Sequence, residues 1–127
     1  MRPESDLLEA IPSLIQQLRN EVIWKPGAAS RHLLKRKLRG HLPIDATPAD
    51  YDQLIIQLLE FKDAAIYVYY TGESAYLAVA STINDRMWLV IASFDGIMET
   101  TFIVENPDAY LQREPFQFVG LMNEVMR

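Results

Sequence analysis

From Ala64 onward the apolar residues recur with a period of two, and this pattern constrains the fold more than any other feature. The connections between the β-rich segments are short, and Asp95-Gly96 is a strong hairpin signal because both residue types tolerate positive φ. Connections of this length cannot cross over a sheet, so neighbouring strands must pair antiparallel. We therefore predict a four-stranded antiparallel β-meander over about 64–104, with strands at Ala64–Thr71, Ala75–Ser81, Met87–Asp95 and Ile97–Val104.

Helical signals lie on both sides of the predicted meander. Apolar residues recur there with the period of an α-helix, behind residues that favour helix N-termini. This order predicts an α+β fold in a single domain, 1–127, with three N-terminal helices and a C-terminal helix. The helices are expected to begin at Ser5 or Asp6, to run over Ser30–Arg39, to begin after Thr47, and to lie near Pro115–Met126.

The composition excludes several classes of protein. The chain has 127 residues and no cysteine, which rules out disulfides, thiolate catalysis and cysteine-based zinc sites. No apolar run approaches the roughly 18 residues of a membrane span, and the N-terminus lacks the apolar stretch of a signal peptide. His32 and His41 are nine residues apart with no carboxylate between them, so no metal site is expected. We expect a cytoplasmic protein without a cofactor.

Positive charge is concentrated in one segment of the chain. Residues 24–44 carry six Lys and Arg, both histidines and no Asp or Glu, within a protein of net charge −5. The remaining residues therefore carry −11. Such separated charge sets a local field that attracts anions. In the predicted second helix, Arg31, Lys35 and Arg39 recur every four residues and share one face. An ordinary solvated basic helix surface explains this face equally well.

Histidine next to cations, without metal ligands, is the side-chain set that metal-independent RNA cleavage needs. An imidazole exchanges protons with the 2′-hydroxyl or the leaving 5′-oxygen, and a guanidinium or ammonium stabilises the charge on phosphorus. His32, beside Arg31 and one turn before Lys35 and Arg36, has this composition. The alternative for His32 is a plain surface histidine. For His41 it is a residue at the helix end that hydrogen-bonds free carbonyls.

The order of elements resembles the barnase–EndoU–colicin–RelE group of RNase toxin folds, in particular its members associated with phages and polymorphic toxins. The similarity covers about Ser30–Val104: a His-bearing helix, Tyr51-x-x-Leu-Ile in another helix, and strands with Trp88-Leu-Val-Ile and Met98-Glu-Thr-Thr-Phe-Ile. The resemblance implies a metal-independent RNase. It implies that the catalytic residues are His32 as acid or base, Lys35 or Arg36 at the phosphate, and Thr100 or Thr101 as the late-strand hydroxyl. In an RNase the basic segment is expected to contact the substrate through Arg31, Arg39 and His41.

A second hypothesis is a non-enzymatic acidic interaction module, such as an immunity protein, an antitoxin-like inhibitor or a homodimer. Residues 45–127 contain thirteen Asp and Glu, and acidic inhibitors capture basic nucleases through carboxylates. Tyrosines on the first predicted hairpin, among them Tyr67 and Tyr69 on one face, fit three uses. Packing between strands ranks first, a protein interface second and base stacking third. The partners expected from the two hypotheses are RNA or another protein, and not a membrane.

Overall fold

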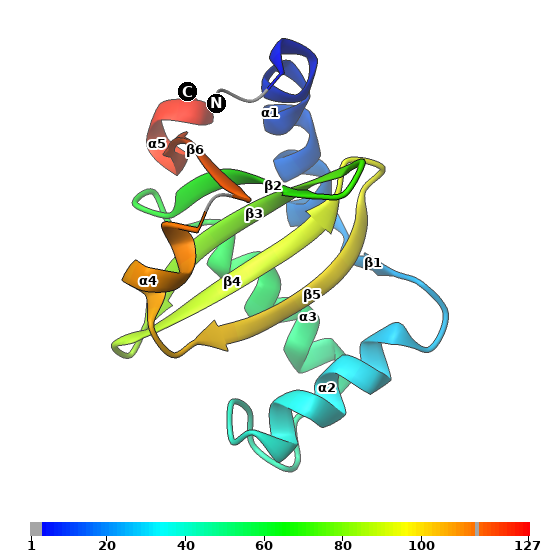
Figure 1. Cartoon of the computed structure of the whole chain (residues 1–127). Helices are drawn as coiled ribbons and strands as arrows, with labels where there is room; N and C mark the ends of the chain where they lie inside the picture. Colours follow the sequence, from blue (N-terminus) through cyan, green and yellow to red (C-terminus); the bar gives the residue numbers. More distant parts are fainter. Residues whose placement is uncertain (1–3, 114) are drawn as a thin grey trace.

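The computed structural model describes residues 4–113 and 115–127 and has an α+β fold, as predicted (Figure 1). Within this part of the chain, four consecutive strands, β2 to β5, lie between helical segments on either side in the sequence. The helices are α1 Ser5–Asn20, α2 Ala28–Leu38, α3 Pro48–Leu58, α4 Pro107–Leu111 and α5 Met122–Val125. The strands are β1 Ile23–Trp24, β2 Ala65–Thr71, β3 Ser74–Ile83, β4 Arg86–Ser93, β5 Ile97–Val104 and β6 Phe116–Leu121.

The strands form one mixed sheet in the order β1-β5-β4-β3-β2-β6. The four predicted segments are β2 to β5, and each pairs antiparallel with the next along the chain. The prediction of a four-stranded sheet, with three helices before it in the sequence and one after it, is nevertheless wrong. The described residues contain six strands and five helices. β1 adds to the β5 edge in parallel, and β6 adds antiparallel to the β2 edge.

The largest error concerns the C-terminal segment, where one helix near 115–126 was predicted. Phe118, Val119, Met122 and Val125 have helical spacing, but the structure places the first two in β6 and the last two in α5. The Leu121 amide donates to the Glu124 carboxylate over 2.8 Å, which caps α5 and ends the strand before it. The backbone groups at the edge of β2 pair with β6, and this pairing outweighs the helical spacing of the apolar residues.

The local sequence signals for the start of α3 and for the β4–β5 turn are confirmed. Thr47 and Asp50 form a capping box at the start of α3, and Pro48 follows Thr47. Gly96 adopts φ +89° in the β4–β5 turn, and a Cβ there would overlap the side-chain amide of Gln17. The N-terminus of α2 was predicted incorrectly: it begins at Ala28, two residues before Ser30, because Gly27 turns the chain at φ +78°.

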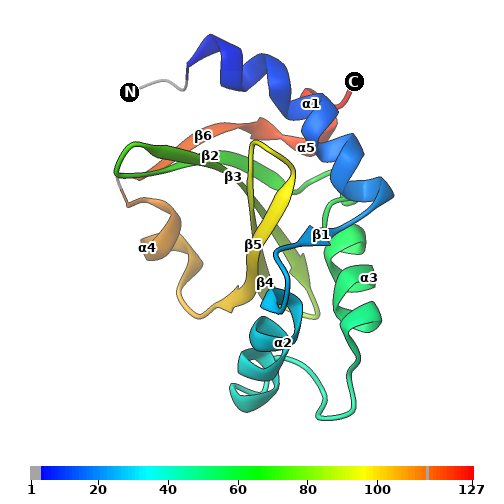
Figure 2. The same ribbon diagram turned by 90° about the vertical axis from the view of Figure 1, so that its right-hand side faces the viewer.

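The two faces of the sheet differ in their cover (Figure 2). Helices α1 and α3 lie on one face, and α4 lies on the other. The first face packs the main core, which includes Leu18, Ile55, Leu58, Ile66, Val79 and Val90. On the second face, called here the open face, a smaller cluster surrounds Ala78, Ala80, Leu89, Ile91, Val104 and Phe116. No helix among the described residues is long and apolar enough to cross a membrane.

Candidate functional site

The outer edge of β5 is covered by side chains rather than by a full-length strand. β1 pairs only with Ile97 and Met98, so the rest of this edge faces α2 and α3. The Tyr51 hydroxyl donates to the Thr101 carbonyl at 2.5 Å, and the Ile103 amide donates to His41 Nδ1 at 3.4 Å. These two bonds satisfy backbone groups that an open sheet edge leaves unpaired. The first fixes α3 against β5, and the second fixes the segment that follows α2.

His32 and Thr100, two of the residues expected at an RNase site, lie together at this edge. His32 Nδ1 is 3.2 Å from Thr100 Oγ1, a hydrogen bond between α2 and β5. The Trp24 ring lies 5.4 Å from the imidazole, centroid to centroid, and restricts its position from β1. Three elements therefore hold one half-buried imidazole in place.

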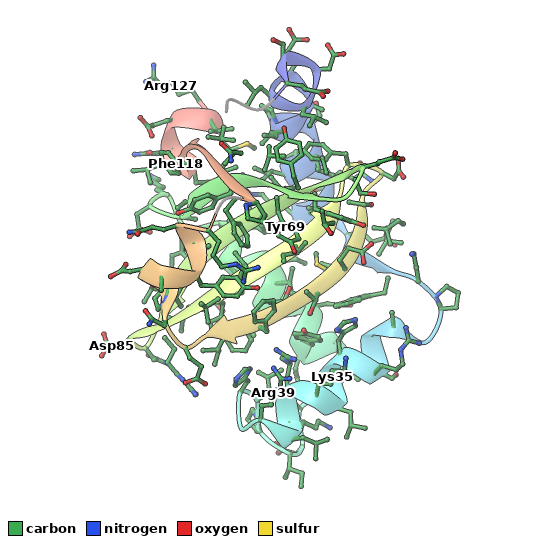
Figure 3. All side chains as sticks on the ribbon, in the orientation of Figure 1. Lys35, Arg39, Tyr69, Asp85, Phe118 and Arg127 are labelled. Carbon is green, nitrogen blue, oxygen red and sulfur yellow. The ribbon has the colours of Figure 1, made fainter. Side chains whose placement is uncertain are left out.

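The surroundings of His32 favour its neutral form. Partial burial lowers the pKa of His32 below its ordinary value, and the positive charges of Lys35, Arg36 and Arg31 lower it further. Glu99 acts in the opposite direction but more weakly. A neutral imidazole at neutral pH accepts a proton. Lys35 and Arg31 are exposed on α2, and Lys35 and Arg39 project from the helix beyond the β5 edge (Figure 3).

Arg36 does not occupy the exposed position expected of a phosphate contact. Its side chain is 3% exposed, and its guanidinium lies 5.6 Å from the centroid of the Phe102 ring. Nη1 is 3.5 Å from His41 Nδ1, and Nε has no hydrogen-bond partner among the described residues. Arg36 is buried because α2 packs this part of its surface onto β5. Of the two residues expected at the phosphate, Lys35 is the exposed one.

The adjacent threonines of β5 point to opposite faces, as strand geometry requires. Thr101 is completely buried, and its hydroxyl donates to Met98 Sδ at 3.7 Å. Thr100 is half-buried and reaches His32. Of the two candidate hydroxyls, only that of Thr100 lies at the proposed site.

His41 lies at the end of α2, but it bonds the sheet instead of the helix carbonyls. Because Nδ1 accepts from the Ile103 amide, the imidazole must be neutral with its proton on Nε2. Burial and the charges of Arg36 and Arg86 lower its pKa, while Glu105 opposes this effect. In the structure Nδ1 of His41 therefore contacts the edge of β5, and the role expected for His41 at a substrate stays a prediction.

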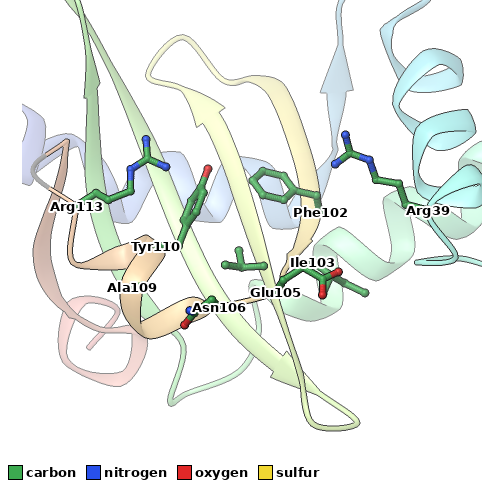
Figure 4. A pocket seen from close by; sticks show the side chains of 9 residues that line it. Arg39, Phe102, Ile103, Glu105, Asn106, Ala109, Tyr110 and Arg113 are labelled. Carbon is green, nitrogen blue, oxygen red and sulfur yellow. The ribbon is translucent and has the colours of Figure 1, made fainter.

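A cavity of about 460 Å³ opens on the open face between β5 and α4 (Figure 4). Arg39 lies on the α2 side and Arg113 on the α4 side, with Phe102 and Tyr110 between them. Of these residues, sequence reasoning identified only Arg39. Phe102 is two residues from Thr100 and so shares its strand face, which was a usable signal. Tyr110 and Arg113 had none, because they reach the cavity only through the packing of α4.

No protein-family model, curated protein or solved structure matches this protein. The described residues also contain no group of three or more His, Asp or Glu side chains that would hold a metal ion.

Acidification is expected to destabilise the fold through both histidines. Their folded-state pKa values lie below the ordinary 6.5, so the unfolded chain binds these protons more readily than the folded chain. The stabilisation is complete above about pH 6.5 and is lost as the pH falls through that value towards the lower folded-state pKa. Each unit of depression is worth about 1.4 kcal/mol. Urea midpoints measured from about pH 7.5 to about pH 5.5 should fall accordingly.

The variant His41→Asn provides the matched control. Its side-chain oxygen can accept from the Ile103 amide in place of Nδ1, but asparagine does not titrate. The loss of stability between the two pH values should be smaller than in the wild type. An identical loss in both proteins would exclude His41 as a source of the pH dependence.

Proposed function

We propose that this protein binds single-stranded RNA along α2 and the adjacent open face and cleaves it without a metal ion. The hydrogen bond between His32 and Thr100 carries the proposal, because it orients an imidazole at the junction of a basic helix and the sheet. A histidine on an ordinary basic helix surface would not need a partner from a strand 68 residues further along the chain.

The tautomer sets the role of each atom. When Nδ1–H donates to Thr100 Oγ1, the Nε2 lone pair is left to accept a proton, and Nε2 has no partner among the described residues. We assign His32 as the base that takes the proton of the RNA 2′-hydroxyl. The 2′-oxygen then bonds to phosphorus, the bond from phosphorus to the 5′-oxygen breaks, and the 5′-oxygen leaves with a proton from water.

The charge around His32 suits this reaction. Lys35 and Arg31 are exposed on the same helix, and they lower the pKa of His32 because their charges act at the imidazole. The same charges attract a phosphodiester and stabilise the extra negative charge that develops on it. The segment 24–44 contains no acid to oppose them.

Incubating the purified protein with single-stranded RNA in EDTA tests the proposal. We expect cleavage products that end in a 2′,3′-cyclic phosphate and begin with a 5′-hydroxyl. An oligonucleotide with one 2′-deoxyribose should resist cleavage at that position only. Intact RNA at high protein concentration, or cleavage of the 2′-deoxy position, would overturn the mechanism.

The interaction-module alternative has one specific observation in its favour. Phe118 is 57% exposed on β6, the outermost strand, where it contacts the Tyr67 ring at 5.5 Å. An exposed aromatic on an edge strand is common in protein interfaces. Figure 3 places Phe118 far from Lys35 and Arg39, so such an interface leaves the α2 surface free.

A further inference from the structure

We propose that the cavity between β5 and α4 is a nucleotide subsite that holds one base on its aromatic floor and a phosphate between Arg39 and Arg113. This inference extends the proposed function by naming where a nucleotide next to the cleaved bond is held. The cavity volume of about 460 Å³ falls within the range of small-molecule sites.

The floor of the cavity is aromatic. The rings of Phe102 and Tyr110 are 6.2 Å apart, centroid to centroid, and inclined at 80°. This spacing leaves no room for a base between the rings, but a base can stack over a ring face that lines the cavity. Stacking on aromatic side chains is the usual way in which proteins hold unpaired bases.

A cationic side chain lies on each side of the aromatic floor. Arg39 extends from the C-terminal end of α2, and Arg113 follows α4, with its guanidinium 4.7 Å from the centroid of the Tyr110 ring. Neither arginine forms an ion pair with a carboxylate in residues 4–113 and 115–127. The guanidinium of buried Arg36, which lies over the Phe102 ring, adds a third positive charge. Two guanidinium groups around aromatic rings, neither with a carboxylate partner among the described residues, are suited to a ligand with both a ring and an anion.

The remaining polar residues of the lining distinguish a base from a second phosphate. Glu105 and Asn106 lie at the β5–α4 connection. A carboxylate repels phosphate but accepts hydrogen bonds from the amino and imino groups of a base edge. We therefore place the phosphate at the arginines and the base edge towards Glu105.

The position of the cavity links it to the proposed cleavage site. Thr100 and Phe102 are two residues apart on β5 and point to the same face, which separates them by about 7 Å. That length is comparable to the distance between successive phosphates of an RNA strand. A nucleotide in the cavity therefore neighbours the phosphodiester at His32.

Calorimetric titration with single ribonucleoside 5′-monophosphates tests the subsite without requiring cleavage. The His32→Ala protein is used beside the wild type, with unphosphorylated nucleosides and inorganic phosphate as probes of each half of the ligand. We expect monophosphates to bind more tightly than either half. Arg39→Gln and Arg113→Gln should each weaken binding about tenfold, while Lys62→Gln, at a separate surface cavity, should not.

The outcomes separate the two proposals. Nucleotide binding that depends on Arg39 and Arg113, in a protein that cleaves no RNA, supports the subsite and overturns the proposed function. Cleavage without nucleotide binding at millimolar concentration overturns the subsite alone. Equal binding by the wild type and both arginine variants, each checked for folding by circular dichroism, also overturns it.

Discussion

Replacing His32 with alanine should lower the rate of RNA cleavage about 10²–10⁴-fold, the usual contribution of a positioned general base. On the proposed mechanism, no other side chain at the site replaces it. Lys35 and Arg31 are cations, Thr100 is a neutral hydroxyl, and His41 Nδ1 is occupied by the Ile103 amide. The effect should appear in single-turnover cleavage of a defined oligonucleotide, measured in EDTA.

The pH profile of the wild type provides an independent readout. Because burial and three cations lower the pKa of His32, the cleavage rate should stay constant near pH 7 and fall only below about pH 6.5, as the base becomes protonated. The profile of an enzyme that uses His32 as a protonated acid would fall in the opposite direction, as the pH rises.

Two substitutions serve as controls for this prediction. Thr100→Val preserves the shape of the side chain but removes the partner of Nδ1, so cleavage should fall while the fold remains. His41→Asn removes the second histidine and keeps an acceptor for the Ile103 amide, so cleavage should persist. Equal activity of His32→Ala and wild type would remove His32 from the mechanism, and a dead His41→Asn would shift attention to the other end of α2.

The meander and α3 were predictable because their signals are local. The Asp95-Gly96 turn, the period of two and the Thr47 cap each depend on a few neighbouring residues. The strands at both edges of the sheet were not predictable in this way. β1 has only two residues within a connector, and β6 has a pattern that also fits a helix. Their conformation is decided by the unpaired edges of β5 and β2.

Only part of the candidate site was predictable from the sequence. His32 was identified by its chemistry, and Thr100 was one of two hydroxyls implied by the family resemblance; the structure brings the two side chains together. The sequence placed Arg36 and His32 in the same row of α2, yet one is buried against Phe102 and the other remains half-exposed. Helical spacing shows which residues share a face, but not which part of that face a strand will cover. Tyr110 lies in α4 and Arg113 follows it, and both reach the cavity through the packing of this helix, which the sequence did not indicate.

Tyr51→Ala should cost about 3–5 kcal/mol of folding free energy, the range for removing a large buried aromatic. Tyr51 is 0% exposed, and its ring is 5.5 Å from that of Trp24 on β1, measured between centroids. Its hydroxyl donates to the Thr101 carbonyl, and burial raises its pKa to about 12, so the phenol remains protonated and able to donate at neutral pH. One side chain on α3 thus holds β1 and the β5 edge. Many domains have a total stability of only about 5–15 kcal/mol.

Tyr51→Phe separates the two contributions. It keeps the ring against Trp24 but leaves the Thr101 carbonyl buried without its donor, which should cost about 1–3 kcal/mol. Urea denaturation of the three proteins, at a pH where both histidines are neutral, gives the comparison. If Tyr51→Phe loses as much stability as Tyr51→Ala, the hydrogen bond to the β5 edge supplies most of the stabilisation and ring packing supplies little. If Tyr51→Phe loses nothing, water reaches the Thr101 carbonyl and the edge is not sealed by Tyr51. The intermediate result requires both contacts, and it would explain how His32 on α2 keeps a fixed distance from Thr100: the edge that carries Thr100 is itself held by α3.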